Sequence, residues 1–339
     1  MVNHSIQLNA HGVRVMLCAA SGDAALDVLP HLASDFEYFL TADIDADCDI
    51  RIELINTLTD DSLPSDLKPL GRPLFCANGG RVFGWGARTV CDYGGGAFVI
   101  TEWRNKTRHF RVIARSAADL HEFSYTALLS ALGEALDRRG FHRVHALGLQ
   151  IEDRAGIVIL PSGGGKSAMA ALLAQHSDVR LFSDETPLIK ENIIYPFPLR
   201  MALRPHIAEV LGLPQAERRF KRRGYGEKSL YAFAPDKVAK PSPIDFVMIG
   251  KIASTPAIER ASTARVMSGL IDAMVVGRGV AQMAEHMLRP SNTLSLLAIG
   301  ASRLQTAARL VRKSSGYVFE VSADARLNAL KLREAPRFF

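Results

Sequence analysis

The segment from Gly156 to Ser167 constrains the fold most, because an apolar run gives way to three consecutive glycines and then to Lys-Ser. It predicts a buried strand, a phosphate-binding loop and a helix that follows at once and continues to Gln175. In such a loop the main-chain N–H groups point at phosphate oxygens, and the positive end of the helix dipole strengthens their field. The sequence therefore predicts a site for a nucleoside triphosphate.

Each residue type in this segment has its own task in the predicted site. Glycines allow the phosphates to approach main-chain atoms that a Cβ would block. We expect Lys166 to reach the terminal phosphates and the Ser167 hydroxyl to ligate Mg²⁺. The usual pattern has one more glycine at the start of the loop, where this chain has Leu160. The predicted nucleotide-binding residues are Ser162, Gly163, Gly164, Gly165, Lys166, Ser167 and Ala168.

An acidic pair follows the next predicted strand, Val179 to Ser183. The chain between Lys166 and Asp184 has room for one helix and one turn only, so this strand is the element after the loop helix. A carboxylate at the carboxyl end of such a strand can hold Mg²⁺ and orient a nucleophile. We therefore predict Asp184 and Glu185 as metal ligands together with Ser167; the alternative is a surface turn that merely begins with two acidic residues.

His145 stands at the start of the strand that precedes the loop strand. If these two strands are neighbours, the imidazole approaches the bound phosphates, where it can add positive charge or help to place the acceptor. The alternative is a structural histidine at a strand end. For Asp184, we expect the positive charges of Lys166 and Mg²⁺ to keep the carboxylate ionised.

Composition excludes several other classes of protein. The chain has 339 residues and a net charge of +6, and no basic tail with interleaved aromatic residues, so nucleic-acid binding is not expected. The four cysteines are scattered, which predicts free thiols and no zinc site. Apolar runs are shorter than the ~18 residues of a membrane span. We expect a cytoplasmic protein that has no membrane-bound partner.

The chain divides into a β-rich part and an α/β part. Short alternating segments dominate residues 1–116, with one helix around Asp23 to Phe39. Ser116 predicts the cap of a long helix that Gly140 ends. We therefore predict a β-rich N-terminal domain over 1–116 and a second domain over 117–339. Within the second, residues 217–228 are expected to form a charged loop, and the last third to be mostly helical.

The run from His145 to Ile151, the loop segment 156–167 and Leu181-Phe-Ser-Asp-Glu185 together resemble the catalytic domain of HPr kinase/phosphorylase. The similarity is greater still to the broad group of HPr-kinase-related proteins. It covers roughly residues 120–200, and a weaker similarity extends over 317–333. The resemblance implies a P-loop kinase domain with a fold like that of phosphoenolpyruvate carboxykinase, here behind a β-rich α+β region. It also implies Mg²⁺-dependent phosphoryl transfer from ATP to a serine hydroxyl of a protein or peptide.

Carried over by position, the resemblance implies three catalytic residues. Asp184 matches the acid/base aspartate, His145 the histidine near the phosphates, and Lys166 the lysine that holds the β/γ-phosphates beside Ser167. Glu185 matches the acidic neighbour. Three departures from the family pattern are Leu160 for the first glycine of the loop, Ala168 for a glutamate and Glu185 for an aspartate.

Three functions stay open at this point. The first is an ATP-dependent kinase for a serine of a protein or peptide. The second is a kinase for a small-molecule alcohol that uses the same site. The third is a nucleotide-binding regulatory protein with little turnover, which Leu160 and Glu185 favour because both depart from the pattern of the active family. A homo-oligomer is compatible with each of them.

Overall fold

The computed structural model describes residues 4–42, 47–57, 71–77, 79–84, 88–104, 106–161, 163–221, 226–280, 282–287 and 292–335. They form two compact units, Met1–Arg139 with Ala281–Leu297, and Gly140–Val280 with Ala298–Phe339. This division differs from the boundary predicted between 116 and 117. The N-terminal unit keeps the long helix after Ser116, and it takes in a segment from the C-terminal third of the sequence.

The N-terminal unit is built on one eight-stranded sheet of order β1-β2-β3-β8-β7-β6-β5-β4. Strands β2, β3 and β8 run parallel, and the remaining neighbours pair antiparallel. The strands are β1 (Ser5–Ala10), β2 (Val13–Ser21), β3 (Ile50–Asn56), β4 (Phe75–Ala77), β5 (Gly80–Phe83), β6 (Arg88–Asp92), β7 (Phe98–Arg104) and β8 (Thr107–Ala114).

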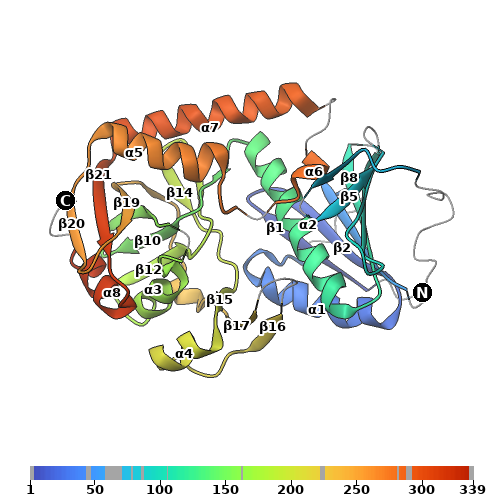
Figure 1. Ribbon diagram of the computed structural model, residues 1–339, viewed down its shortest axis with the longest axis horizontal. Coiled ribbons are helices and arrows are strands. Elements are labelled where there is room, and N and C mark those ends of the chain that lie inside the picture. Colours follow the sequence, from blue (N-terminus) through green and yellow to red (C-terminus); the bar gives the residue numbers. More distant parts are fainter. Residues whose placement is uncertain are drawn as a thin grey trace. The chain divides into compact units, whose positions relative to one another are not determined.

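Two helices cover one face of this sheet (Figure 1). Helix α1 (Asp23–Asp35) packs on α2 (Ala117–Arg138), which lies against β3 and β8. The Ser116 hydroxyl accepts a hydrogen bond from the Asp119 amide at 3.0 Å, and Gly140 just beyond the helix has a φ of 79°. The predicted cap and end of this helix are therefore confirmed.

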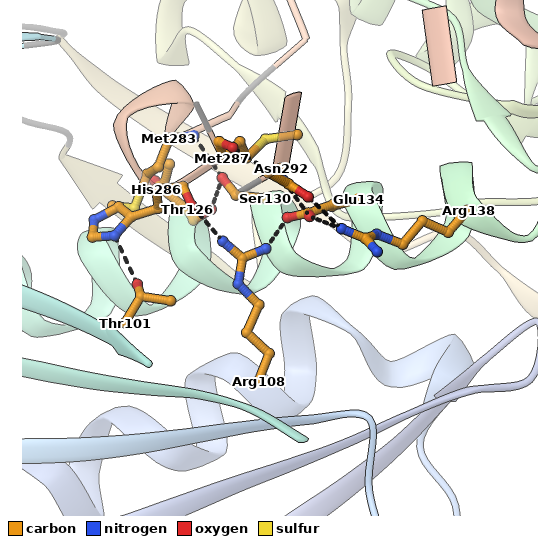
Figure 2. A network of polar contacts seen from close by, with 10 residues as sticks. All are labelled: Thr101, Arg108, Thr126, Ser130, Glu134, Arg138, Met283, His286, Met287 and Asn292. Atoms are coloured by element: carbon orange, nitrogen blue, oxygen red, sulfur yellow. Dashed lines mark hydrogen bonds and ion pairs between the residues drawn. The ribbon is translucent and has the colours of Figure 1, made fainter. Parts of the chain in front are cut away.

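A buried polar network holds the segment around α6 (Ala284–Met287) on the N-terminal unit (Figure 2). Arg108 on β8 pairs with Glu134 on α2, and both side chains are almost fully buried. Arg108 Nη2 also donates to the carbonyl of His286 at 2.7 Å, and the Met283 amide donates to Ser130 Oγ at 2.6 Å. Since burying such groups without partners is costly, this segment completes the unit although it lies far away in sequence. The residues drawn in Figure 2 are Thr101, Arg108, Thr126, Ser130, Glu134, Arg138, Met283, His286, Met287 and Asn292.

The C-terminal unit is built on a six-stranded mixed sheet of order β12-β10-β11-β19-β21-β20. Strands β11, β19 and β21 run parallel, whereas β10 runs antiparallel to both of its neighbours. The chain from β11 to β12 therefore crosses over β10 instead of pairing with the next strand in space. The strands are β10 (Leu147–Ile151), β11 (Arg154–Ile159), β12 (Val179–Ser183), β19 (Phe246–Ile252), β20 (Ala257–Arg260) and β21 (Ser315–Val321).

Helices cover both faces of this sheet, so the unit has a mixed α/β architecture of three layers (Figure 1). Val158 on β11 packs in the core formed with α3 and α8, whereas its neighbour Ile157 packs in the core formed with α5 and α7. This alternation explains why the strand reads as a continuous apolar run. The helices are α3 (Lys166–Leu173), α5 (Thr263–Leu270), α7 (Thr293–Lys313) and α8 (Ala325–Arg333). Within the described residues, no helix has both the length and the apolar character needed to span a membrane.

Two smaller sheets and the remaining short elements surround this core. The four-stranded sheet has the order β18-β14-β13-β9, and the three-stranded sheet has the order β15-β17-β16. The elements are β9 (His142–Arg143), β13 (Leu188–Lys190), β14 (Ile193–Tyr195), β15 (Met201–Leu203), β16 (Arg218–Lys221), β17 (Glu227–Tyr231), β18 (Ser242–Pro243), α4 (Pro205–Leu211), the 3₁₀ turn Pro235–Lys237 and a π-helix (Ile271–Val276). A further 3₁₀ turn, Glu37–Phe39, belongs to the N-terminal unit.

Two expectations about the C-terminal unit are wrong. The segment 217–228 contains the ends of an antiparallel pair, because Arg219 on β16 pairs with Ser229 on β17; residues 222–225 lie outside the described part. The last third is also less helical than expected, since β19 runs through the centre of the sheet. Its apolar run is short and has no period of two, which is typical of a strand that is buried on both faces.

We predict that Ser130→Ala weakens the N-terminal unit, because the buried Met283 amide loses its acceptor. The free energy of unfolding should fall by about 1–3 kcal/mol in urea titrations. Ser124→Ala is the matched control on the same helix: its Oγ is buried and has no hydrogen-bond partner in the described part of the chain. This control should change stability by less than about 0.5 kcal/mol. Equal losses in the two variants would contradict the assigned role of the network.

Candidate functional site

The loop between β11 and α3 has the backbone of an anion cradle. Gly163 and Gly165 have φ values of 78° and 80°, and no described atom lies within 4 Å of the place where either Cβ would be. The first bond within α3 runs from the Met169 amide to the Gly165 carbonyl. The amides of the first helical turn therefore have no carbonyl partner within the helix. Amides without a partner at a helix N-terminus suit an anion such as phosphate.

Leu160, which replaces the first glycine of the usual loop, does not enter this cradle. Its side chain is buried in the core under α3. Room for it comes from Gly250 on β19, since a Cβ at that position would lie 2.4 Å from Leu160 Cδ2. The departure from the sequence pattern is thus compensated in the core, where Gly250 makes room for the Leu160 side chain.

The acidic strand brings its carboxylate to the start of the loop helix. Ser167 Oγ donates a hydrogen bond to Asp184 Oδ2 at 2.8 Å. Ser167 belongs to the first turn of α3, which follows β11, and Asp184 follows β12. The contact therefore joins segments that follow two strands with β10 between them in the sheet. Lys166 Nζ lies 3.5 Å from the Leu160 carbonyl and interacts electrostatically with Glu185 and Asp184. The structure therefore brings Ser167 and Lys166 close to Asp184, as the sequence predicts.

The turn that carries the two carboxylates is shaped by side chains on either side of it. Ser183 Oγ accepts hydrogen bonds from the amides of Glu185 at 3.3 Å and Thr186 at 3.0 Å. The pairing of β10 with β12 shifts register between Gly148 and Leu149, where Phe182 on β12 is an extra residue; a Cβ on Gly148 would lie 2.7 Å from Pro187. A shift of this kind bends a strand and redirects the side chains at its end. It lets the chain after β12 cross β10 while Asp184 points back toward α3.

Burial controls the charges at the site. Asp184 is 4% exposed, and burial together with the neighbouring Glu185 raises its pKa to about 7. The expectation that this carboxylate stays ionised applies to the site with Mg²⁺ bound and stays a prediction. Without the ion, desolvation outweighs the nearby Lys166 and favours the protonated form. Burial likewise lowers the pKa of Lys166.

His145 lies in the link between β9 and β10, at the edge of the sheet where β11 ends and the loop begins. The amide of Ala146 donates to the carbonyl of Glu185 at 3.0 Å, which ties this link to the acidic turn. Burial and the nearby Lys166 lower the pKa of His145 to about 4. Without phosphates, these surroundings favour the neutral ring, which can help to place an acceptor through a hydrogen bond. Added positive charge beside bound phosphates stays a prediction.

The residues present fit a magnesium ion. Mg²⁺ typically takes one or two carboxylates from a protein and fills its remaining positions with phosphate oxygens and water. Ser167 and Asp184 supply a hydroxyl and a carboxylate in contact, and Glu185 beside them is exposed. In the described part of the chain, no group of three or more His, Cys, Asp or Glu side chains forms a complete metal cage. An ion at this site would therefore depend on the nucleotide for further ligands.

Two of the predicted nucleotide-binding residues need separate comment. Ala168 can offer only its amide, because its side chain packs in the core; Ser162 lies outside the described residues.

Three residues that shape the site were not predicted from the sequence. Ser183 was detectable, since a serine before an acidic pair often caps a turn. Gly148 and Gly250 were not, because their role depends on which residues face them across the sheet.

Comparison with models of known protein families gives no match, and comparison with functionally curated proteins gives no significant match either. The functional argument therefore depends on the arrangement of the residues described above.

We predict that Asp184→Asn stabilises the metal-free protein more at pH 8 than at pH 5. The raised pKa means that the folded state binds a proton that the unfolded chain releases near pH 4. That contribution is present at low pH and is lost as the pH rises through about 7. Asparagine removes the buried charge and can still accept the Ser167 bond. The gain at pH 8 should reach about 1–3 kcal/mol, measured by urea titration in EDTA; an equal effect at both pH values would contradict it.

Proposed function

We propose that this chain is a Mg²⁺-dependent kinase that transfers the γ-phosphoryl group of ATP to a serine hydroxyl of a protein or peptide. The observation that carries the proposal is the contact of Ser167 with Asp184 at the mouth of a glycine-rich loop that also presents Lys166. The C-terminal unit is proposed to have the P-loop kinase fold that the resemblance implies. The order of loop strand, helix and acidic strand supports this, as does the mixed sheet.

In the proposed reaction, the loop amides and Lys166 hold the β- and γ-phosphates and offset the charge that builds up on their oxygens. Phosphoryl transfer passes through a loose transition state, so positioning and charge compensation supply most of the rate. Ser167 and Asp184, with Glu185 beside them, would hold Mg²⁺. When bound, the ion supplies charge neutralisation between the two phosphates.

Asp184 is the proposed acid/base residue. It would orient the acceptor hydroxyl and accept its proton while the hydroxyl oxygen bonds to the γ-phosphorus and the bond to the β–γ bridging oxygen breaks. A carboxylate with a pKa close to the working pH suits this task. The neutral imidazole of His145 would help to place the acceptor through a hydrogen bond.

Two alternative functions are a small-molecule alcohol kinase and a nucleotide-binding regulatory protein. A small-molecule alcohol kinase would use the same residues, so the acceptor alone distinguishes it. The regulatory alternative was favoured by Leu160 and Glu185. Since Leu160 is accommodated in the core beside Gly250, one of the two observations that favoured this alternative is weakened.

One experiment separates the three functions. The purified protein is incubated with γ-labelled ATP, Mg²⁺ and a cell lysate, and the label is followed. Label on a polypeptide at serine supports the proposal, label on a small solute supports the alcohol kinase, and binding of ATP without transfer supports the regulatory protein.

We predict that Lys166→Ala abolishes transfer and weakens ATP binding at least about tenfold, because the phosphate tail loses its main counter-charge. Lys251→Ala is the control. Lys251 lies on β19 of the same sheet, and its ammonium pairs with Glu320 at the surface. Binding measured by calorimetry should be unchanged in this control. Normal transfer by Lys166→Ala would remove the kinase proposal.

We predict that Asp184→Asn and Ser167→Ala separate nucleotide binding from transfer. Asp184→Asn should still bind ATP while transfer falls at least about a hundredfold, because the acid/base residue is lost. Ser167→Ala should raise the Mg²⁺ concentration needed for half-maximal transfer, because one ligand is missing. Steady-state assays over a range of Mg²⁺ concentrations test both, and full transfer by Asp184→Asn would show that another group is the base.

A further inference from the structure

A turn with two glycines follows the π-helix and packs against His145. Gly277 has a φ of 70° and Gly279 a φ of 89°. The turn is held in place by its own backbone, since the Arg278 amide donates to the Asp272 carbonyl at 3.1 Å and the Val280 amide to the Gly277 carbonyl at 3.1 Å. Its position relative to the π-helix is therefore defined. Sequence reasoning gave this turn no role.

The contact between Gly279 and His145 depends on the absence of a side chain. A Cβ on Gly279 would lie 2.6 Å from Cδ2 and 2.7 Å from Nε2 of the imidazole. Carbon and nitrogen atoms that are not bonded do not approach so closely, because their van der Waals contact lies near ~3.5 Å. Only glycine lets the turn lie directly on the ring.

The main chain of His145 is fixed independently of this contact. Its amide donates to the carbonyl of Ala273 in the π-helix at 3.1 Å. The residues on either side of His145 bond to the segment 185–187. The Val144 amide donates to the Pro187 carbonyl, and the Ala146 amide donates to the Glu185 carbonyl. Because hydrogen bonds fix the backbone on both sides of His145, a side chain added at Gly279 would have to rotate the imidazole ring.

The orientation of the ring decides what His145 can bind. Its Nδ1 is buried and has no hydrogen-bond partner in the described part of the chain. A buried nitrogen of this kind gains most from a ligand that supplies the missing partner. Rotation of the ring by a few tens of degrees would point this nitrogen elsewhere.

We propose that the turn Gly277–Val280, through Gly279, sets the orientation of the His145 imidazole, and that Gly279 is a positioning residue for the transfer reaction. The part of this inference that concerns catalysis rests on the proposed function. The part that concerns the ring does not, because the contact exists without any ligand. Gly279 acts only through His145 and does not touch the reacting groups.

The chain offers a matched control in the same turn. Gly277→Ala places a side chain at a similarly positive φ and so imposes the same kind of backbone strain as Gly279→Ala. Its Cβ would meet only Arg303 Nη1 at 3.6 Å and Val280 Cγ2 at 4.0 Å, which are ordinary contacts. Any effect that comes from strain alone should therefore appear in both variants.

The first test needs no activity. Carbon–proton NMR spectra of the histidine rings are recorded for the full-length protein without nucleotide, and His145 is assigned from the signal that His145→Ala lacks. Gly279→Ala should shift the His145 ring signals, and Gly277→Ala should leave them in place. Unchanged His145 signals in Gly279→Ala, or equal shifts in both variants, would overturn the proposal.

The second test uses the transfer assay. Gly279→Ala should lower kcat at least about tenfold and leave KM for ATP within about twofold, because the ring moves while the phosphate loop stays intact. In the His145→Ala background the same change should cause no further loss. Additive losses would show that Gly279 acts elsewhere. A wild-type protein without any transfer would refute the proposed function instead, and the NMR result would still decide the role of the turn.

Discussion

The hydrogen bond between the Ser167 hydroxyl and the Asp184 carboxyl group is the contact on which the proposed site depends. It joins the first turn of α3, which follows β11, to the end of β12, and β10 lies between β11 and β12 in the sheet. The bond forms inside the protein, where the carboxyl group is nearly removed from water. The same burial raises the pKa of the acid toward neutrality. A stability cost of this kind is typical of a group that is retained for its chemistry.

Three glycines outside the glycine-rich loop allow the close approaches on which the geometry of the site depends. Gly250 makes room for Leu160 under the loop, Gly148 makes room for Pro187 beyond the acidic pair, and Gly279 lies on the ring of His145. Each is defined by the residue opposite, and none belongs to a recognisable motif. The glycine-rich loop thus depends on its own glycines for backbone conformation and on distant glycines for its surroundings.

The N-terminal unit shows the same dependence on distant sequence. Its sheet and its two large helices come from one continuous stretch, yet Arg108 and Ser130, both buried, also bond to the segment around α6. A boundary drawn from composition alone falls at residue 116, because the strands end there. The packing of α2 on β3 and β8 places the helix with the strands before it.

The local chemistry of the loop was predictable from the sequence, and so were the order of loop strand, helix and acidic strand and the cap of α2 at Ser116. These features depend on residues close together in the chain. The insertion of β10 between the loop strand and the acidic strand was not predictable, nor were the packing of Leu160 in the core, the lowered pKa of His145 and the contact of its ring with Gly279. These were decided by tertiary structure, because each depends on which atoms from distant segments exclude water or fill space around the residue.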